Sequence, residues 1–279
     1  MLARIPLATL TRKRTAALLG SVLLAATCFV GASPVAASTA RELLDESGRR
    51  AGMASWHDRK FDLTIESRAG ESVARVREAK VEESNDPGAG HRTFIEFTAP
   101  ADVEGSLYLH LTPADGEDQE WIYAPAARRP RRLAPGQSDE SSTGAELSYR
   151  EVEGLTRMLS WRDLDAEASL VGDETLDGRA CHVVRLAPKH PQPGVESYDV
   201  WLGSDDLLVY KVVPHGGDRS PKEILPSAYE TIGGHATPLV VDVIAPDGSS
   251  RTVFRLRDVH YDVGLGDDAF SMSRLNHGR

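Results

Sequence analysis

Cysteine is almost absent from this chain of 279 residues, and its two cysteines are Cys28 and Cys181. Cys28 lies in an apolar N-terminal stretch that we expect to be removed from the mature protein. Cys181 would then be alone, so the mature chain could not form an intramolecular disulfide bond. We interpret Cys181 as a packed side chain in a strand, because an isolated cysteine in an apolar run is usually structural.

The sequence also lacks the patterns that mark common catalytic and metal-binding sites. It has no Gly-x-Ser-x-Gly turn, and no glycine-rich segment is followed by the Lys-Ser/Thr pair that cradles phosphate. The nine histidines are scattered, and none lies three or four residues from another, as paired zinc ligands on a helix would. Asp205–Asp206 and Asp267–Asp268 lie in turn contexts, where aspartate forms local hydrogen bonds. We therefore expect no enzymatic activity and neither a metal nor another cofactor.

Long apolar runs are missing as well, apart from one at the N-terminus. The basic residues Arg12–Arg14 precede the apolar segment 16–32, and small residues follow at Val35–Ala37. This order is typical of a secretory signal peptide, and the run is shorter than the ~20 residues needed to span a membrane. We predict a signal peptide over residues 1–37 with cleavage near Ala37; a retained N-terminal anchor is the alternative.

Basic residues are too few to balance the acidic ones. Removal of residues 1–37 takes four basic residues and no acidic one, which leaves 28 basic against 42 acidic side chains, a net charge of −14. A protein this acidic repels nucleic acid and anionic membrane surfaces. Arg128, Arg129, Arg131 and Arg132 form a local exception. They either balance nearby acids at an exposed strand end or contact an anionic partner, such as a lipid headgroup or an acidic transporter surface.

Alternation of apolar and polar residues dominates the mature chain. Phe61, Leu63 and Ile65 fall on one side of a predicted strand, and the segment Leu107–Leu111 alternates in the same way. Tight turns are predicted where glycine follows aspartate between strand-like runs, because glycine readily adopts a positive φ. These turns are Asp115–Gly116, Asp177–Gly178 and Asp247–Gly248.

Helical patterns occur in two places only. Thr39 and Glu42 have the spacing of a capping box, and Leu43, Leu44 and Ser47 follow along one face of the expected helix. Residues 148–161 also have a helical period, whereas the proline- and glycine-rich segment Pro214–Pro226 is predicted to be a loop. The whole pattern of predicted strands and helices indicates one domain over residues 38–279. It is mainly β with a few helices: a single curved antiparallel sheet of about 10–11 strands, an N-terminal helix and an inserted helical lid.

Several short motifs occur in a fixed order along the chain. They are Phe97-x-x-Pro100-x-Asp102-x-x-Gly105, Asp118-x-x-Trp121-x-Tyr123-x-Pro125, Gly144–Tyr149, Tyr198–Leu202 and Phe270–Ser271. This ordered set resembles the outer-membrane lipoprotein-sorting proteins, the LolA-like half-barrels. The chain departs from the family pattern at Glu146 and Leu147, where the family has Asp and Phe, so the negative charge of the acid is kept.

The resemblance implies a periplasmic half-open β-barrel that is hydrophobic inside and lidded by helices, and it implies acyl chains as the ligand. Together with the alternation, it nominates residues for a hydrophobic groove. These are Ile95, Phe97, Leu107, Leu109, Leu111, Trp121, Tyr123, Val200 and Leu202, with Tyr149, Leu155 and Leu159 on the lid side. Each could instead pack as ordinary core against the covering helices.

The expected function is that of a periplasmic carrier or chaperone for a lipid or an acylated protein. The resemblance implies that the donor is an inner-membrane transporter of the resistance-nodulation-division type, and we expect the carrier to be a monomer. Two alternatives remain open. One is a lipid-sensing regulator on the same fold, and the other is an accessory subunit that docks on an exporter and carries nothing.

Overall fold

The computed structural model describes residues 39–50, 56–69, 72–86, 90–113, 117–133, 166–189, 195–216, 222–245 and 247–277. The predicted signal peptide, the helical segment 148–161 with Tyr149, Leu155 and Leu159, the motif Gly144–Tyr149 and the Asp115–Gly116 turn all lie outside these residues. The compact unit that contains the described residues runs from Ser38 to Arg279.

The described part begins with helix α1 (Ala40–Arg50) and ends with the 3₁₀ helix η3 (Asp267–Phe270) and helix α3 (Met272–His277). Thirteen strands lie between them in the described residues. They are β1 (Asp58–Ala69), β2 (Ser72–Asp86), β3 (Gly90–Ala99), β4 (Leu107–Thr112), β5 (Gln119–Ala124), β6 (Arg129–Arg132), β7 (Ala166–Leu176), β8 (Arg179–Pro188), β9 (Ser197–Gly203), β10 (Val209–His215), β11 (Glu223–Ile232), β12 (His235–Ile244) and β13 (Ser250–Tyr261).

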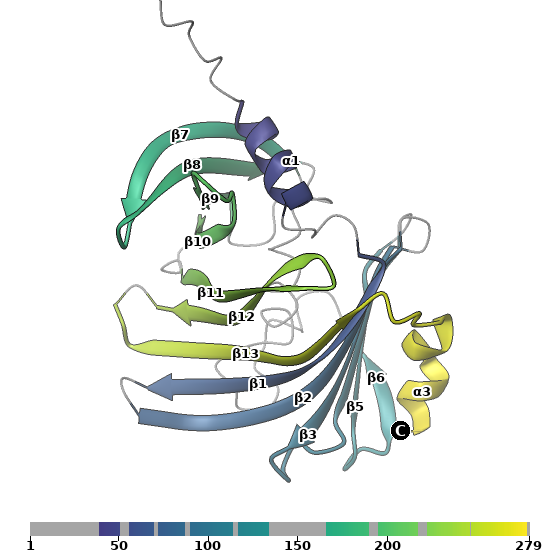
Figure 1. Cartoon of the computed structure of the whole chain (residues 1–279). Helices are drawn as coiled ribbons and strands as arrows, with labels where there is room; N and C mark the ends of the chain where they lie inside the picture. Colours follow the sequence, from purple (N-terminus) through teal and green to yellow (C-terminus); the bar gives the residue numbers. More distant parts are fainter. Residues whose placement is uncertain are drawn as a thin grey trace, which may run out of the picture. The chain divides into compact units, whose positions relative to one another are not determined.

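All thirteen strands form one antiparallel sheet in the order β6-β5-β4-β3-β2-β1-β13-β12-β11-β10-β9-β8-β7. Every neighbouring pair is consecutive in the chain except β1 and β13, which join the two halves of the meander from Arg59↔Tyr261 to Ala69↔Ser250. The sheet curls strongly but does not close (Figure 1). The predicted half-open antiparallel barrel is confirmed, with more strands than the ten or eleven expected.

The N-terminal helix forms as its sequence predicts. Thr39 N–H donates to Glu42 Oε2 at 2.7 Å, and Glu42 N–H donates to Thr39 Oγ1 at 3.2 Å, so the capping box is complete. Leu43, Leu44 and Ser47 are buried, as their common face predicts. Ser47 Oγ donates to the carbonyl oxygen of Leu207 at 2.6 Å, which fixes α1 against the segment between β9 and β10.

The predicted turn at Asp177–Gly178 is confirmed by positive φ angles of 48° and 83° at these two residues. The predicted loop Pro214–Pro226 is wrong at both ends, because β10 continues to His215 and β11 begins at Glu223. Prolines can lie in strands where their missing N–H breaks no necessary ladder bond. In keeping with this, β10 and β11 share a single registered pair, Val212↔Ile224.

A buried carboxylate connects the start of β1 to the chain that leaves β13. The carboxylate of Asp58 accepts backbone N–H bonds from Val263 at 2.8 Å and from Gly264 and Leu265 at 3.1 Å each. Three donors on one carboxylate satisfy backbone groups that no strand partner reaches. Asp58 therefore directs the C-terminal segment toward η3 and α3.

Replacing this carboxylate should weaken the whole C-terminal attachment. We expect Asp58→Ala to lower the free energy of unfolding by about 2–4 kcal/mol, because three backbone donors lose a charged acceptor. Urea denaturation followed by tryptophan fluorescence measures the change. The control is Asp267→Ala, whose side chain is 95% exposed and whose replacement should change stability by less than about 0.5 kcal/mol. Equal losses for the two variants would contradict this role of Asp58.

Candidate functional site: the inner face of the sheet

The inner face of the curled sheet carries one continuous apolar cluster, here called the inner cluster. Its buried members include Phe61, Leu63 and Ile65 of β1, Ala79 and Val81 of β2, Ile95 and Phe97 of β3, Tyr108 of β4, Val184 and Leu186 of β8, Val200 and Leu202 of β9, and Leu43 and Leu44 of α1. Because successive side chains of a strand point to opposite faces, the strand members line one face of the sheet across both halves of the meander, and Leu43 and Leu44 of α1 belong to the same cluster.

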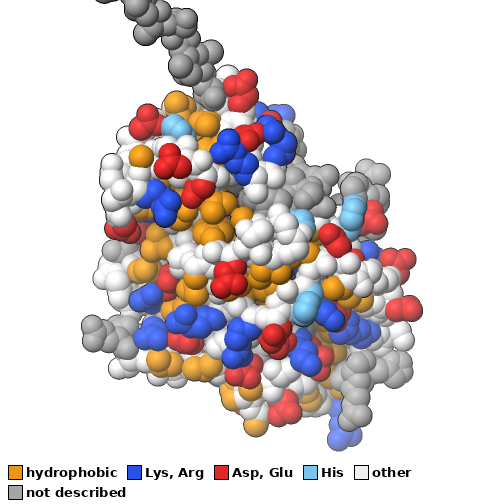
Figure 2. Space-filling model, in the orientation of Figure 1, with side chains coloured by type: hydrophobic (Ala, Val, Ile, Leu, Met, Phe, Trp, Pro, Cys, Tyr) orange, Lys and Arg blue, Asp and Glu red, His pale blue; other side chains and the backbone are white. Residues whose placement is uncertain are grey.

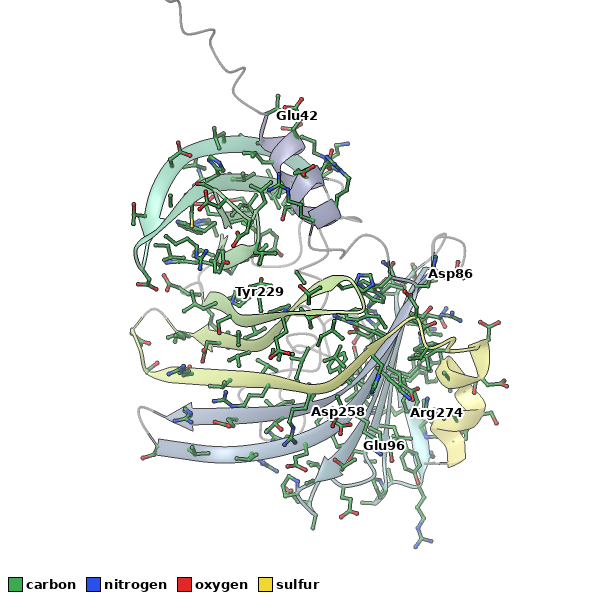
Figure 3. All side chains as sticks on the ribbon, in the orientation of Figure 1. Glu42, Asp86, Glu96, Tyr229, Asp258 and Arg274 are labelled. Carbon is green, nitrogen blue, oxygen red and sulfur yellow. The ribbon has the colours of Figure 1, made fainter. Side chains whose placement is uncertain are left out.

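A second apolar cluster, here called the outer cluster, lies on the opposite face beneath η3 and α3. Its buried members are Phe94, Leu107, Leu109, Phe270 and Leu275, and Leu111, Trp121, Tyr123 and Met272 pack against them. Arg274 of α3 bonds to Glu82 and places its guanidinium 4.0 Å from the centre of the Phe94 ring, which holds the helix on the sheet (Figure 3).

The predicted groove residues are therefore divided between two faces. Ile95, Phe97, Val200 and Leu202 belong to the inner cluster. The remaining described set belongs to the outer cluster and comprises Leu107, Leu109, Leu111, Trp121 and Tyr123.

The second set thus lies on the opposite face of the sheet from the first set. Leu109 pairs across the strands with Phe94 and Trp121, whereas Ile95 pairs with Tyr108. Since Tyr108 and Leu109 are adjacent in β4, their side chains point to opposite faces.

Charged residues cover the outer face over β1, β12 and β13. Glu66 accepts from Arg68 at 2.9 Å and from Arg255 at 3.1 Å, and these bonds lower the pKa of the Glu66 carboxyl although desolvation opposes them. Arg251 pairs with Asp242 at 2.6 Å. Figure 2 shows lysine, arginine and acidic side chains interspersed in the region where these strands lie. This part of the outer face is therefore suited to contact with solvent, in contrast to the inner cluster.

The arginine patch lies at one edge of the sheet. Arg128 has a φ of 51° in the turn after β5, and Arg129, Arg131 and Arg132 are exposed on the edge strand β6. Arg132 lies 5.8 Å from the centre of the Trp121 ring. Pro130 and the arginines make β6 a poor template for another strand, because proline lacks an N–H donor and the charges repel further copies of the edge.

One buried ion pair interrupts the apolar lining at the end of the inner face. Arg59 Nε donates to Glu83 Oε2 at 2.5 Å, and the side chains are 5% and 0% exposed. Burial alone would lower the pKa of Arg59, but the Glu83 carboxylate and the neighbouring Tyr261 raise this pKa above its ordinary value. The Arg59 guanidinium also lies 4.8 Å from the centre of the Trp56 ring. The Arg59 guanidinium is thus in contact with both the Glu83 carboxylate and the Trp56 ring.

Neither a metal centre nor a membrane-crossing helix is found in the described part of the chain. Within it, no three His, Cys, Asp or Glu side chains are placed to hold a metal ion. None of its helices combines the length and apolar character required to cross a bilayer. Cys181 is buried, and desolvation raises the pKa of its thiol, as expected of a packed side chain.

Comparison with known proteins gives the family and the fold. A family model described as an uncharacterized protein matches residues 89–277. The chain belongs to this family, and its fold is the LolA-like half-barrel. A DUF1329 family protein from Desulfovibrio piger is 25% identical, with a TM-score of 0.72 over 85% of this chain and 99% of that chain. A comparison with curated proteins gives no match.

Two further solved structures share the fold of this chain. One is described as an outer membrane lipoprotein-sorting protein domain from Vibrio parahaemolyticus; it is 18% identical, with a TM-score of 0.70 over 84% of this chain and 97% of that chain. The other, a LolA superfamily protein from Nitrosomonas europaea, is 16% identical, with a TM-score of 0.65 over 86% of this chain and 100% of that chain. The resemblance seen in the sequence motifs is therefore confirmed.

The buried ion pair supplies a test of the inner-face geometry. We expect Glu83→Met to lower the free energy of unfolding by about 3–5 kcal/mol, because it leaves the Arg59 guanidinium buried without its counter-charge. The double variant Arg59→Met/Glu83→Met should regain most of this loss, since two apolar side chains suit the neighbouring apolar lining. Urea denaturation of the single and double variants measures the difference. Additive losses in the double variant would contradict a coupled buried pair.

Proposed function

We propose that this LolA-like protein is a carrier that shields the acyl chains of a lipid or an acylated protein against its inner face. The continuous inner cluster is the observation that carries the proposal. Each buried methylene group of an acyl chain contributes about 0.8 kcal/mol without directional bonds, so an apolar face can hold cargo firmly and still exchange it. We propose no catalytic step, and the candidate site consists of apolar side chains.

The proposed place of action is the periplasm, between the inner and outer membranes. The N-terminal sequence order of a signal peptide supports export, and the half-barrel fold is shared with a domain described as outer membrane lipoprotein-sorting. The proposed groove is lined by Ile95, Phe97, Val200 and Leu202, with Tyr149, Leu155 and Leu159 as proposed lid residues. The proposed working form is a monomer.

Two adjacent residues of β12 provide a matched test of uptake. Leu239 packs against the inner cluster, whereas Val240 points to the outer face and pairs with Arg255. We expect Leu239→Asp to weaken binding of the apolar fluorescent probe N-phenyl-1-naphthylamine at least about tenfold, because a carboxylate is costly among apolar side chains. Val240→Asp should bind the probe within about twofold of the wild-type affinity, because its carboxylate lies on the charged outer face.

Fluorescence titration of the purified variants, with circular dichroism as a control for folding, measures both affinities. Equal binding by all three proteins would refute the inner face as the site. Mass spectrometry of an organic extract from protein purified without detergent then separates the carrier from the non-carrying accessory subunit. Copurified acyl lipid supports the carrier, and a lipid-free protein that also fails to bind the probe supports the accessory role.

We further propose that the arginine patch of β6 docks on an acidic surface of an inner-membrane transporter of the resistance-nodulation-division type. The patch is exposed on a protein with a large excess of acidic residues, so it offers a local attraction for an acidic surface. This contact would orient the carrier during transfer, and it should weaken as salt concentration rises.

Reversing two charges on β6 tests this contact. We expect Arg129→Glu/Arg131→Glu to reduce co-purification with solubilised inner-membrane proteins about tenfold or more, because two attractions become repulsions. The control is Arg41→Glu/Arg49→Glu, which makes the same change in net charge on α1, where the side chains are 51% and 70% exposed. Quantitative mass spectrometry compares the two. Equal reductions would show a general charge effect and would refute a specific role of β6.

A further inference from the structure

Buried polar residues form a continuous row across six strands of the inner face. Each member of the row is paired across the strands with the next. The pairs, in order, are Tyr261↔Arg59, Arg59↔Glu83, Glu83↔Thr93, Thr93↔His110 and His110↔Glu120. Paired residues of an antiparallel sheet point to the same face. The polar row, read from β13 to β5, therefore consists of Tyr261, Arg59, Glu83, Thr93, His110 and Glu120.

The polar row lies next to the apolar rows of the inner cluster. Two residues away from the polar row on each strand, the same face carries an apolar row whose members are also paired in register. They are Phe61, Val81, Ile95, Tyr108 and Ile122. The inner face therefore changes from hydrocarbon to hydrogen-bonding groups within two residues of each strand. The change occurs close to Asp86, the last residue of β2, which is labelled in Figure 3.

The five members of the polar row on β1 to β5 are buried although most of them are charged or strongly polar, and Tyr261 is half-buried. Glu83 is 0% exposed, Thr93 1%, His110 3%, Arg59 4% and Glu120 7%. The row continues toward β12, where Thr237 Oγ1 lies 2.9 Å from the Tyr261 hydroxyl oxygen and the His235 ring centre lies 4.3 Å from that of Tyr261. Polar side chains on seven adjacent strands are thus gathered at one end of the inner face.

A row of buried polar side chains lowers the free energy of unfolding if the inner face serves only as a packed core. Apolar residues of similar volume in place of a buried ion pair are often neutral or stabilising, so packing alone does not favour Arg59 and Glu83. Glu83 Oε1 is buried and accepts no hydrogen bond from any group that the structure describes, which leaves a buried acceptor within the polar row. A ligand hydroxyl or amide N–H would satisfy this acceptor.

We propose that the polar row binds the head of the cargo, and that this head is uncharged and bears hydroxyl or amide groups. This inference rests on the proposed carrier function: the tail lies along the apolar rows and the head meets the polar row. The row offers hydroxyls, imidazoles and carboxylates, and its guanidinium is already neutralised by Glu83. The guanidinium that could pair with a phosphate or a free carboxylate is therefore already engaged.

The chemistry fits two sources, the free glycerol hydroxyls of a partly acylated glycerolipid and the sugar of a glycolipid. Both present neutral hydroxyls next to acyl chains. Either head would be oriented by the row, so the row would select among amphiphiles that the apolar rows alone cannot distinguish, since hydrophobic burial is non-directional.

The test compares probes that share an alkyl chain and differ only in the head. N-phenyl-1-naphthylamine is displaced from the wild-type protein by methyl laurate, by 1-monolauroylglycerol, by dodecyl glucoside or by dodecyl phosphate, each below its critical micelle concentration. We expect 1-monolauroylglycerol or dodecyl glucoside to bind about tenfold more tightly than methyl laurate, from one or two additional hydrogen bonds. The stronger of the two identifies the source of the head, and dodecyl phosphate should show no such advantage.

Two nearly isosteric variants then remove members of the row. Thr93→Val and Glu120→Gln should reduce the preference for the hydroxyl-bearing head to about twofold or less while methyl laurate binds as before. The control Thr64→Val makes the same chemical change on the outer face of β1, where Thr64 accepts from Arg257 at 3.3 Å, and it should keep the full preference.

The outcomes separate this inference from the carrier function. If no probe binds, the carrier function fails and the inference fails with it. If methyl laurate binds as well as the hydroxyl-bearing probes, or if neither Thr93→Val nor Glu120→Gln changes the preference, the carrier function stands and the role of the polar row is refuted. A preference for dodecyl phosphate would refute the uncharged head.

Discussion

The pairing of β1 with β13 is the interaction on which the rest of the structure depends. It joins two meanders, β1 to β6 and β7 to β13, into one sheet, and it runs along almost the full length of both strands. Without it, each meander would expose an apolar edge and half of the inner cluster. With it, Phe61, Leu63 and Ile65 stand at the middle of a face that extends across both meanders. Asp58 lies at the start of β1 and secures the C-terminal segment at the same junction.

The sheet is two-faced because each strand alternates, and the two faces are covered differently. The inner face is apolar over most of its width and polar along one row. On the outer face, charged pairs cover β1, β12 and β13, whereas η3 and α3 cover a second apolar cluster on β3 to β5. The proposed cargo binding and the proposed transporter docking therefore fall on different surfaces, the inner face and the basic edge strand β6.

The sequence predicts the fold better than the site, for a physical reason. Alternation, the capping box at Thr39 and the Asp-Gly turn at Asp177 are local signals, and each is realised in the structure. Alternation also shows that Leu107 and Leu109 share a face, but it cannot show which face is inward. That depends on whether a distant helix covers the other side, as α3 does here.

The polar row was missed because its members are distant in sequence and meet only through strand register. The sequence did contain one usable signal: Arg59 lies two residues before Phe61 and therefore on the same face. Strand β11 was missed because Pro214 and Pro226 are typical of a loop. Pro226 instead lies within β11, opposite Val241.

The single registered pair between β10 and β11 divides the half-barrel into two panels, one of four strands and one of nine. Side chains span this junction instead: Lys211 Nζ donates to Glu223 Oε1 at 2.6 Å, and the Tyr229 hydroxyl donates to the carbonyl oxygen of Val209 at 2.7 Å. The joint between the two panels therefore depends on contacts that single substitutions can remove. The other joints of the sheet depend on main-chain hydrogen bonds, which most substitutions leave in place.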